Sequence, residues 1–211
     1  MTTAQPSSRL RWWQCDRKTL AVAGLLAAAI SGWLATRVAI TSAERRAVAV
    51  FEGLGARVYY DFEWDENNRL TYPTGPTWLL RLFGNARAVN CNSCTISDSH
   101  LAELSALSRL ETLDLTNTPV SGSGFRDVRD LKLLKHIYLG GTQVNDGAIK
   151  ELARCTGLTD VILSQTQVTD AGLADLEKLD NLRSLRIDGT RCGAAGVARL
   201  LERFPNCQIG R

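Results

Sequence analysis

Six cysteines and two histidines are the side chains of this sequence best suited to chemistry. Cys91 and Cys94 have the C-x-x-C spacing that redox motifs and zinc sites share. A structural zinc site takes four ligands with paired spacing, and the sequence contains no second pair of this kind. We therefore expect no metal site, and a thiol-redox or metal role of Cys91 and Cys94 is retained only as a minor alternative.

The histidines and the acidic residues do not form a recognisable catalytic pattern. His100 and His136 stand far apart in the sequence, and neither has both a Ser or Cys nucleophile and an acid placed as a hydrolase triad requires. One acidic run lacks the D-x-D-x-D-G spacing of a calcium loop, which favours a solvated strand end and turn; its members are Asp61, Glu63, Asp65 and Glu66. We expect no enzymatic activity and no cofactor.

Most of these residues lie in a 24-residue repeat. Five units follow one another without a gap and begin at Arg87, Glu111, Lys135, Thr159 and Arg183. In each unit, positions 3 and 5 are apolar with polar neighbours, which is the alternation of a short strand. Positions 15 and 18 are also apolar, at the spacing of a helical stripe. Each unit is therefore predicted to form a strand, a turn, a short helix and a return loop.

Inward positions of the repeat explain the cysteines without chemistry. Position 8 is Cys94 in the first unit and threonine in the other four, namely Thr118, Thr142, Thr166 and Thr190. Cys91, Cys155 and Cys192 fall at positions 5, 21 and 10, which are mostly Leu, Val or Ile in other units. Free cysteine behaves as a small buried hydrophobe. A Cys91–Cys94 disulfide would be strained, because both residues point inward on one tight turn.

Helix starts are expected after position 10 of each unit. Asp98, Asp146 and Asp170 stand at position 12, just before the apolar stripe, where N-cap residues are expected. The second and fifth units carry glycine pairs instead, at Ser121–Gly124 and Gly193–Gly196. We expect looser turns at these two places.

The repeat resembles a known family. With Leu158, the fourth unit reads L-x-x-V-x-L-x-x-T-x-V up to Val168, which is similar to the leucine-rich repeat L-x-x-L-x-L-x-x-N/T/C-x-V/I. The resemblance runs from Arg87 to Ile209 and implies an α/β solenoid, right-handed, with a parallel sheet on the concave face and short helices on the convex face. In this family the position-8 residue satisfies backbone groups of the neighbouring loop, and a threonine hydroxyl can do so.

The N-terminal part of the chain has a different composition. Residues 1–18 form a basic tail, and residues 19–40 form an apolar segment in which Leu20–Ile40 carries one charge, Arg37. Its 21 residues would span about 31 Å as a helix, which matches the hydrocarbon core of a membrane. We predict one transmembrane helix. A cleaved signal peptide with Thr41-x-Ala43 as its cleavage site is the alternative, but the apolar run is longer than such a signal needs.

The charges beside this segment predict its orientation. Four basic residues precede it and three arginines lie at or after its end, which favours a single-pass protein of the cell membrane with its N-terminus inside and its repeats outside the cytoplasm. Gly24, Ala28 and Gly32 lie on one side of the predicted helix, where small residues allow helices to associate, so self-association is an open alternative.

Residues 41–86 are predicted to connect the membrane to the repeats. Ser42–Gly53 reads as an amphipathic helix, Arg57–Trp64 as a strand, and Trp78–Phe83 as a short helix that covers the first coil. At the other end, Phe204–Ile209 reads as a terminal half-coil. Together with the repeats, these segments resemble bacterial membrane-anchored leucine-rich repeat proteins with internalin-like or RNase-inhibitor-like repeats; the resemblance implies an interaction module without chemistry of its own.

Positions 2, 4 and 6 of each unit should point outward from the strands, onto the concave face. The predicted protein-binding residues are Asn90, Asp114, His136, Tyr138, Ile162 and Arg186. An exposed tyrosine beside an isoleucine, surrounded by polar groups, is typical of a protein-binding surface. Residues 87–211 carry 15 basic and 15 acidic side chains, so no basic face for nucleic acid is expected. We predict protein recognition at the membrane; the alternative is a structural scaffold or spacer of the cell envelope.

Overall fold

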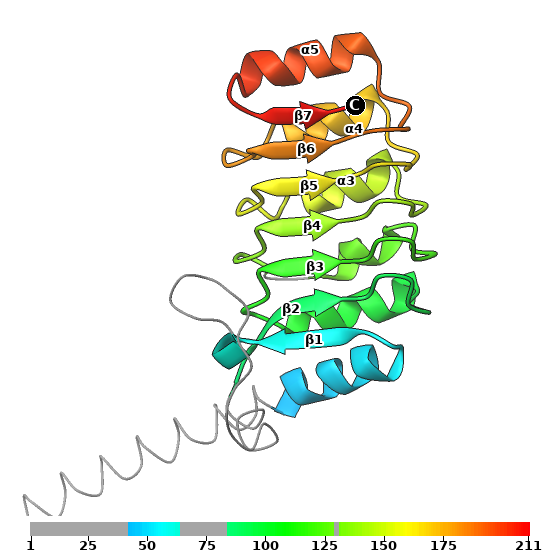
Figure 1. Cartoon of the computed structure of the whole chain (residues 1–211), viewed down its shortest axis with the longest axis vertical. Coiled ribbons are helices and arrows are strands. Elements are labelled where there is room, and N and C mark those ends of the chain that lie inside the picture. The colour runs from blue at the N-terminus through cyan, green and yellow to red at the C-terminus, as the bar shows by residue number, and fades with distance from the viewer. Residues whose placement is uncertain (1–41, 64–83, 129–130) are drawn as a thin grey trace, which may run out of the picture. The chain divides into compact units, whose positions relative to one another are not determined.

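The computed structural model describes residues 42–63, 84–128 and 131–211. The predicted span, Leu20–Ile40, and the predicted lid helix, Trp78–Phe83, lie outside these residues. Within them, no helix has the length and apolar character needed to cross a membrane. The described chain contains one seven-stranded sheet whose strand order follows the sequence (Figure 1). Its strands are β1 (Arg57–Tyr60), β2 (Ala86–Asn90), β3 (Thr112–Asp114), β4 (His136–Tyr138), β5 (Asp160–Ile162), β6 (Ser184–Arg186) and β7 (Gln208–Gly210).

The sheet register confirms the gapless repeat. From β2 to β7 all neighbouring strands are parallel, and each residue pairs with the residue 24 positions further on. Val89, for example, lies beside Leu113, which lies beside Ile137. Because each unit adds one strand to the same sheet, the fold is an α/β solenoid of the leucine-rich repeat kind. We call the five 24-residue units coils 1 to 5.

The helices lie along one face of the sheet (Figure 1). Their segments are η2 (Asp98–Ala106), η3 (Ser123–Asp127), α3 (Asp146–Leu152), α4 (Asp170–Leu176) and α5 (Ala194–Arg203). Coils 1 and 2 form 3-10 helices, and coils 3 to 5 form α-helices. The core lies between helices and sheet: the side chains at positions 3 and 5 are buried in all five coils.

The threonines at position 8 close the turn that follows each strand. Their hydroxyls donate to the carbonyl three residues earlier, for example from Thr118 to Leu115 and from Thr142 to Leu139 at 2.6 Å each. The bond therefore lies within one coil, whereas the sequence predicted a bond to the neighbouring loop. The residue before each threonine has a positive φ, and Asn117 and Gln165 adopt this left-handed conformation without being glycine. Because the chain turns sharply here, the carbonyl that follows the strand does not bond the neighbouring strand. The threonine hydroxyl donates a hydrogen bond to this carbonyl instead.

The aspartates at position 12 do not cap their own helices, and this prediction was wrong by one residue. The N-cap of α3 is Asn145, whose side chain accepts from the Ala148 N–H, and that of α4 is Thr169. The carboxylate one residue later turns to the next coil instead. Asp146 accepts from the N–H and the hydroxyl of Thr169 at 2.8 and 2.7 Å, and from the Gly172 N–H at 3.0 Å.

The same bond between coils recurs along the helix side. Asp98 accepts from the N–H and the hydroxyl of Ser121 at 3.0 and 2.8 Å, and from the Gly122 N–H at 2.8 Å. Asp170 accepts from the Gly193 N–H at 2.6 Å. Burial alone would raise the pKa of Asp98, but these hydrogen bonds outweigh it and lower the pKa below its usual value. We call this contact the aspartate staple; it joins coils 1 and 2, 3 and 4, and 4 and 5.

The residue facing each staple is small for a steric reason. A Cβ atom on Gly172 would lie 2.6 Å from the Asp146 carboxylate, and one on Gly196 would lie 2.4 Å from that of Asp170. Between coils 2 and 3 the arrangement is exchanged: position 12 is Gly122, and a Cβ there would lie 2.4 Å from the Cβ of Ala148. Each step therefore combines one side chain with one glycine, which accounts for the glycines of coil 2, where the sequence predicted a looser turn.

The fifth coil also differs from its prediction. Instead of a loose turn at Gly193–Gly196, the α-helix α5 begins at Ala194 and runs to Arg203. Its N-cap, Gly193, has no side chain with which to bond a backbone N–H. The Asp170 carboxylate of coil 4 accepts from the Gly193 N–H, so the preceding coil fixes the chain where this helix starts.

A helix and an antiparallel strand cover the first coil. Residues 42–53 are helical as predicted, and β1 pairs with β2 in the antiparallel sense. The strand ends at Tyr60, four residues earlier than expected, because Asp61–Glu63 turns into a 3-10 helix (η1) and Glu63 accepts from the Tyr60 N–H at 2.8 Å. The buried Glu44 carboxylate accepts from the Ala86 N–H at 2.6 Å, which ties the helix to β2. Burial raises the pKa of Glu44.

Candidate functional site

The candidate site is the sheet face opposite the helices, formed by positions 2, 4 and 6 of the coils; we call it the strand face. The register places five of the six predicted binding residues side by side in one row across β2 to β6, in the order Asn90, Asp114, Tyr138, Ile162 and Arg186. The sixth, His136, lies in the adjacent row. Asn90 and Arg186 are exposed, and the other four are partly buried.

Tyr138 and Ile162 occupy the middle of this row, on neighbouring strands. Gly140 lies two residues after Tyr138 and is buried. A Cβ atom there would have the methyl groups of Ile162 and Thr116 at 3.8 Å, and the Ser164 carbonyl at 3.5 Å. Burial, followed by the negative charges of Asp160 and Asp114, raises the pKa of Tyr138. The phenol is therefore neutral at physiological pH.

Charged side chains surround this apolar centre, and most of them are paired. His136 Nδ1 lies 2.9 Å from Asp160 Oδ2. At the other end of the row, Arg186 Nε lies 3.4 Å from Asp188 Oδ2, which also accepts from the Ser164 hydroxyl at 3.0 Å. Asp160 and Asp188 were not among the predicted binding residues, although positions 2 and 6 of the repeat assign both to this face.

An ion ladder runs along the edge of the strand face at position 1. Glu111 lies between Arg87 and Lys135, with contacts of 3.0 and 2.9 Å, one on each neighbouring coil. Partial burial would raise the pKa of Glu111, but these two cations outweigh it and lower the pKa. Side chains of this ladder are about one quarter to one half exposed, so its contribution to stability is small.

The His136–Asp160 pair does not complete a hydrolytic site. An imidazole held by a carboxylate is one part of a catalytic triad, which also needs a nucleophile bonded to the other ring nitrogen. In the described part of the chain, the contact to Asp160 is the one polar contact of the His136 side chain. The second histidine has a structural role, since His100 Nδ1 lies 2.9 Å from the Ser97 hydroxyl at the start of η2.

The cysteines of the described coils are free thiols. Cys91 is fully buried, and burial together with the neighbouring Cys94 raises its pKa to about 12. A thiol with so high a pKa is a weak nucleophile and a weak metal ligand, because both roles require the thiolate. Over residues 42–63, 84–128 and 131–211, no group of three or more His, Cys, Asp or Glu side chains is placed to hold a metal ion. This geometry favours the structural interpretation of Cys91 and Cys94.

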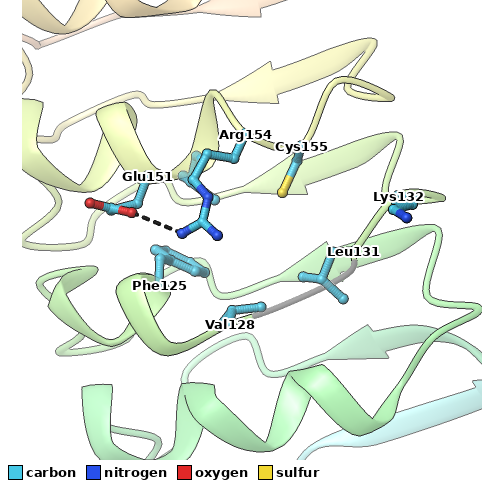
Figure 2. Close-up of a pocket in the computed structure, with 8 residues that line it drawn as sticks. Phe125, Val128, Leu131, Lys132, Glu151, Arg154 and Cys155 are labelled. Atoms are coloured by element: carbon cyan, nitrogen blue, oxygen red, sulfur yellow. Dashed lines mark hydrogen bonds and ion pairs between the residues drawn. The ribbon is translucent and has the colours of Figure 1, made fainter.

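A concave feature lies on the helix side, where coil 2 meets coil 3 (Figure 2). It is a pocket of about 160 Å³ lined by Phe125, Val128, Leu131, Lys132, Glu151, Leu152, Arg154 and Cys155. Arg154 lies across it and bonds Glu151 at 3.2 Å. Burial raises the pKa of the Cys155 thiol, more than the nearby Arg154 lowers it. The pocket thus contains a thiol that burial keeps in its protonated form.

Comparisons with known proteins find leucine-rich repeat structures. No protein-family profile matches the sequence, and no curated protein matches it. Among solved structures, an internalin (InlF) of Listeria monocytogenes is similar over 52% of this chain and 30% of its own, with 22% identity and a TM-score of 0.44. The ectodomain of the receptor kinase SOBIR1 of Arabidopsis thaliana is similar over 80% of this chain and 91% of its own, with 16% identity and a TM-score of 0.49.

A leucine-rich repeat protein of Leptospira interrogans is similar over 52% of this chain and 27% of its own, with 22% identity and a TM-score of 0.44. This chain therefore spans less than a third of that protein and of the internalin. All three neighbours are leucine-rich repeat proteins. What the strand face does must be argued from its own residues.

Proposed function

We propose that this chain is a non-catalytic recognition module that binds a protein partner through the strand face. The observation that carries the proposal is the pair Tyr138 and Ile162, adjacent in register and left partly exposed at the centre of the face. A sheet with one face buried against helices needs only polar residues on the other. Aromatic and aliphatic side chains surrounded by polar ones are what the centre of a protein interface requires.

Substitution of both central residues tests this proposal. In the variant Tyr138→Asp/Ile162→Asp, binding of the partner is expected to fall by more than about tenfold, since central interface residues contribute most of the binding energy. The partner would be captured in intact cells by a photoreactive amino acid at position 164, which replaces Ser164 beside this pair. The photoreactive amino acid at position 174, on the exposed side of α4, is the control and should not crosslink to the partner.

The alternative function, a structural scaffold or spacer, predicts the opposite result. Both substituted side chains are partly exposed, so the folded state should persist and circular dichroism should not change. If the double variant is folded and gives the same adducts at position 164 as the unsubstituted chain, the strand face is not a recognition surface. The spacer interpretation would then replace the present proposal.

We further propose that residues 19–40 hold the module at the cell membrane, with the repeats outside the cytoplasm. The support is the length of Leu20–Ile40 and its single charge, together with the basic residues that precede it. The full chain is expected to stay in membranes after alkaline washing, and a periplasmic reporter fused after Arg211 should be active. A secreted chain that begins near Glu44 would contradict the anchor and support a cleaved signal peptide.

A further inference from the structure

Tyr138 lies between two carboxylates on the strand face. In the sheet register Asp114 is its direct neighbour on β3, while Asp160 lies on β5 beside His136. Both carboxylates therefore lie on strands that pair directly with β4, the strand of Tyr138. Paired strands are about 4.8 Å apart. The aromatic ring is therefore bordered by negative charge on two sides.

The two carboxylates differ in their partners. Asp160 is held by His136 and by the Thr159 hydroxyl. Asp114 accepts only from the backbone N–H of Thr116, at 2.9 Å, and no lysine, arginine or histidine of the described residues forms an ion pair with it. Asp188 and Glu111, the other acidic side chains on this face and its edge, have basic partners in coils 1 to 5. Among the described carboxylates of the strand face, Asp114 is thus the one that contacts no basic side chain.

The apolar part of the site begins at Ile162, on β5. Ile162 follows Tyr138 in the row, and a Cβ atom at Gly140 would lie 3.8 Å from methyl groups of Ile162 and Thr116. A carboxylate, an aromatic ring and aliphatic side chains that are close together match one kind of side chain. Arginine and lysine carry a cationic head that binds carboxylates and aromatic rings, on an aliphatic stem that packs on apolar surface.

We propose that the protein partner places an arginine or lysine side chain on the strand face. Its charged head would contact Asp114 and the ring of Tyr138, and its aliphatic stem would lie over Gly140 and Ile162. This inference rests on the proposed function, because it names the chemistry of the partner at the same surface. An acidic partner would meet the unpaired Asp114 carboxylate with like charge, and a wholly apolar one would remove it from water without a counter-charge.

A peptide selection tests the inference. A random peptide display library is selected on the purified full chain, and enriched peptides are synthesised. They are expected to contain arginine or lysine next to an apolar residue more often than the input library does. Binding to Asp114→Asn should be weaker by about tenfold, the scale of one charge-assisted contact. Replacing the peptide's arginine by citrulline, which is neutral and of similar shape, should weaken binding similarly.

Matched variants separate failure of this inference from failure of the proposed function. Asn at position 114 retains an oxygen acceptor for the Thr116 N–H, and Asp175→Asn removes the same charge from the helix side as a control. Peptides that require Tyr138 and Ile162 but lack basic residues, and bind Asp114→Asn unchanged, would overturn the inference alone. If every enriched peptide binds Tyr138→Asp/Ile162→Asp unchanged, both the inference and the proposed function fail.

Discussion

Replacing Asp98 with alanine is expected to lower the free energy of unfolding by about 3 kcal/mol, as measured by urea denaturation. The Asp98 carboxylate accepts from two groups of Ser121 and from the Gly122 N–H, all on the next coil. A hydrogen bond to a charged group contributes about 1.5–3 kcal/mol, and backbone donors left unpaired add to the loss. The bonds share one carboxylate, so their contributions do not add fully.

The staple formed by Asp98 should also make the stability of the protein depend on pH. Because the folded-state pKa of Asp98 is lowered, the unfolded chain binds more protons than the folded chain between the two pKa values. The stabilisation by the carboxylate is therefore fully present above the usual pKa of an aspartate and is lost as the pH falls through the folded-state value. The difference in stability between the unsubstituted chain and Asp98→Asn should shrink over that acidic range.

Asp175→Ala is the matched control for Asp98→Ala. Asp175 is also a helix-side aspartate, but it bonds Lys178 within the same coil at 2.6 Å, and the lysine side chain is 61% exposed. Such a surface pair contributes about 0.2–1 kcal/mol at most. Equal losses for Asp98→Ala and Asp175→Ala would show that the bonds between coils do not set the stability of the stack.

The regular part of the fold was predictable from the sequence because every coil must bury the same positions. Position 3 aligns across all the coils at a constant offset of 24 residues, and its side chain is apolar in each. The outward positions of the strands follow from the same alternation. The row that contains Tyr138 and Ile162 could therefore be assigned to the strand face before the structure was known, whereas its role in binding stays a prediction.

Contacts between different coils could not be predicted in the same way. The position-12 aspartates resemble N-caps in sequence, but in the structure Asp146 bonds the following coil while Asn145 caps the helix. The partners on the strand face are equally distant in sequence: His136 and Asp160 stand 24 residues apart, and their pairing depends on rotamers that periodicity does not determine. The pair Gly122 and Ala148 could not be predicted for the same reason. The small size of each residue is explained by the other, which lies in a neighbouring coil.

A comparison of two glycines tests this close approach of the coils. Gly124→Ala is expected to lower the free energy of unfolding by about 3 kcal/mol, the upper part of the range for forcing an added carbon into a packed site. The new Cβ would lie 2.1 Å from the backbone carbonyl oxygen of Asp98. A backbone atom cannot rotate away as the end of a side chain can, so coils 1 and 2 would have to separate and the staple between them would lengthen.

Gly140→Ala makes the same chemical change where the structure has room. At that position the nearest atom to a new Cβ lies 3.5 Å away, which is ordinary van der Waals contact, and alanine restricts the unfolded chain more than glycine does. Its effect on the free energy of unfolding is expected to stay within about 0.5 kcal/mol, because the added methyl group fits without strain. If Gly124→Ala were as mild as Gly140→Ala, the coils would not be held as close as the staple geometry requires. If Gly124→Ala alone greatly lowers the free energy of unfolding, the close packing that limits side-chain size lies at the junction between coils. There each small residue is matched to the group that it faces in the neighbouring coil.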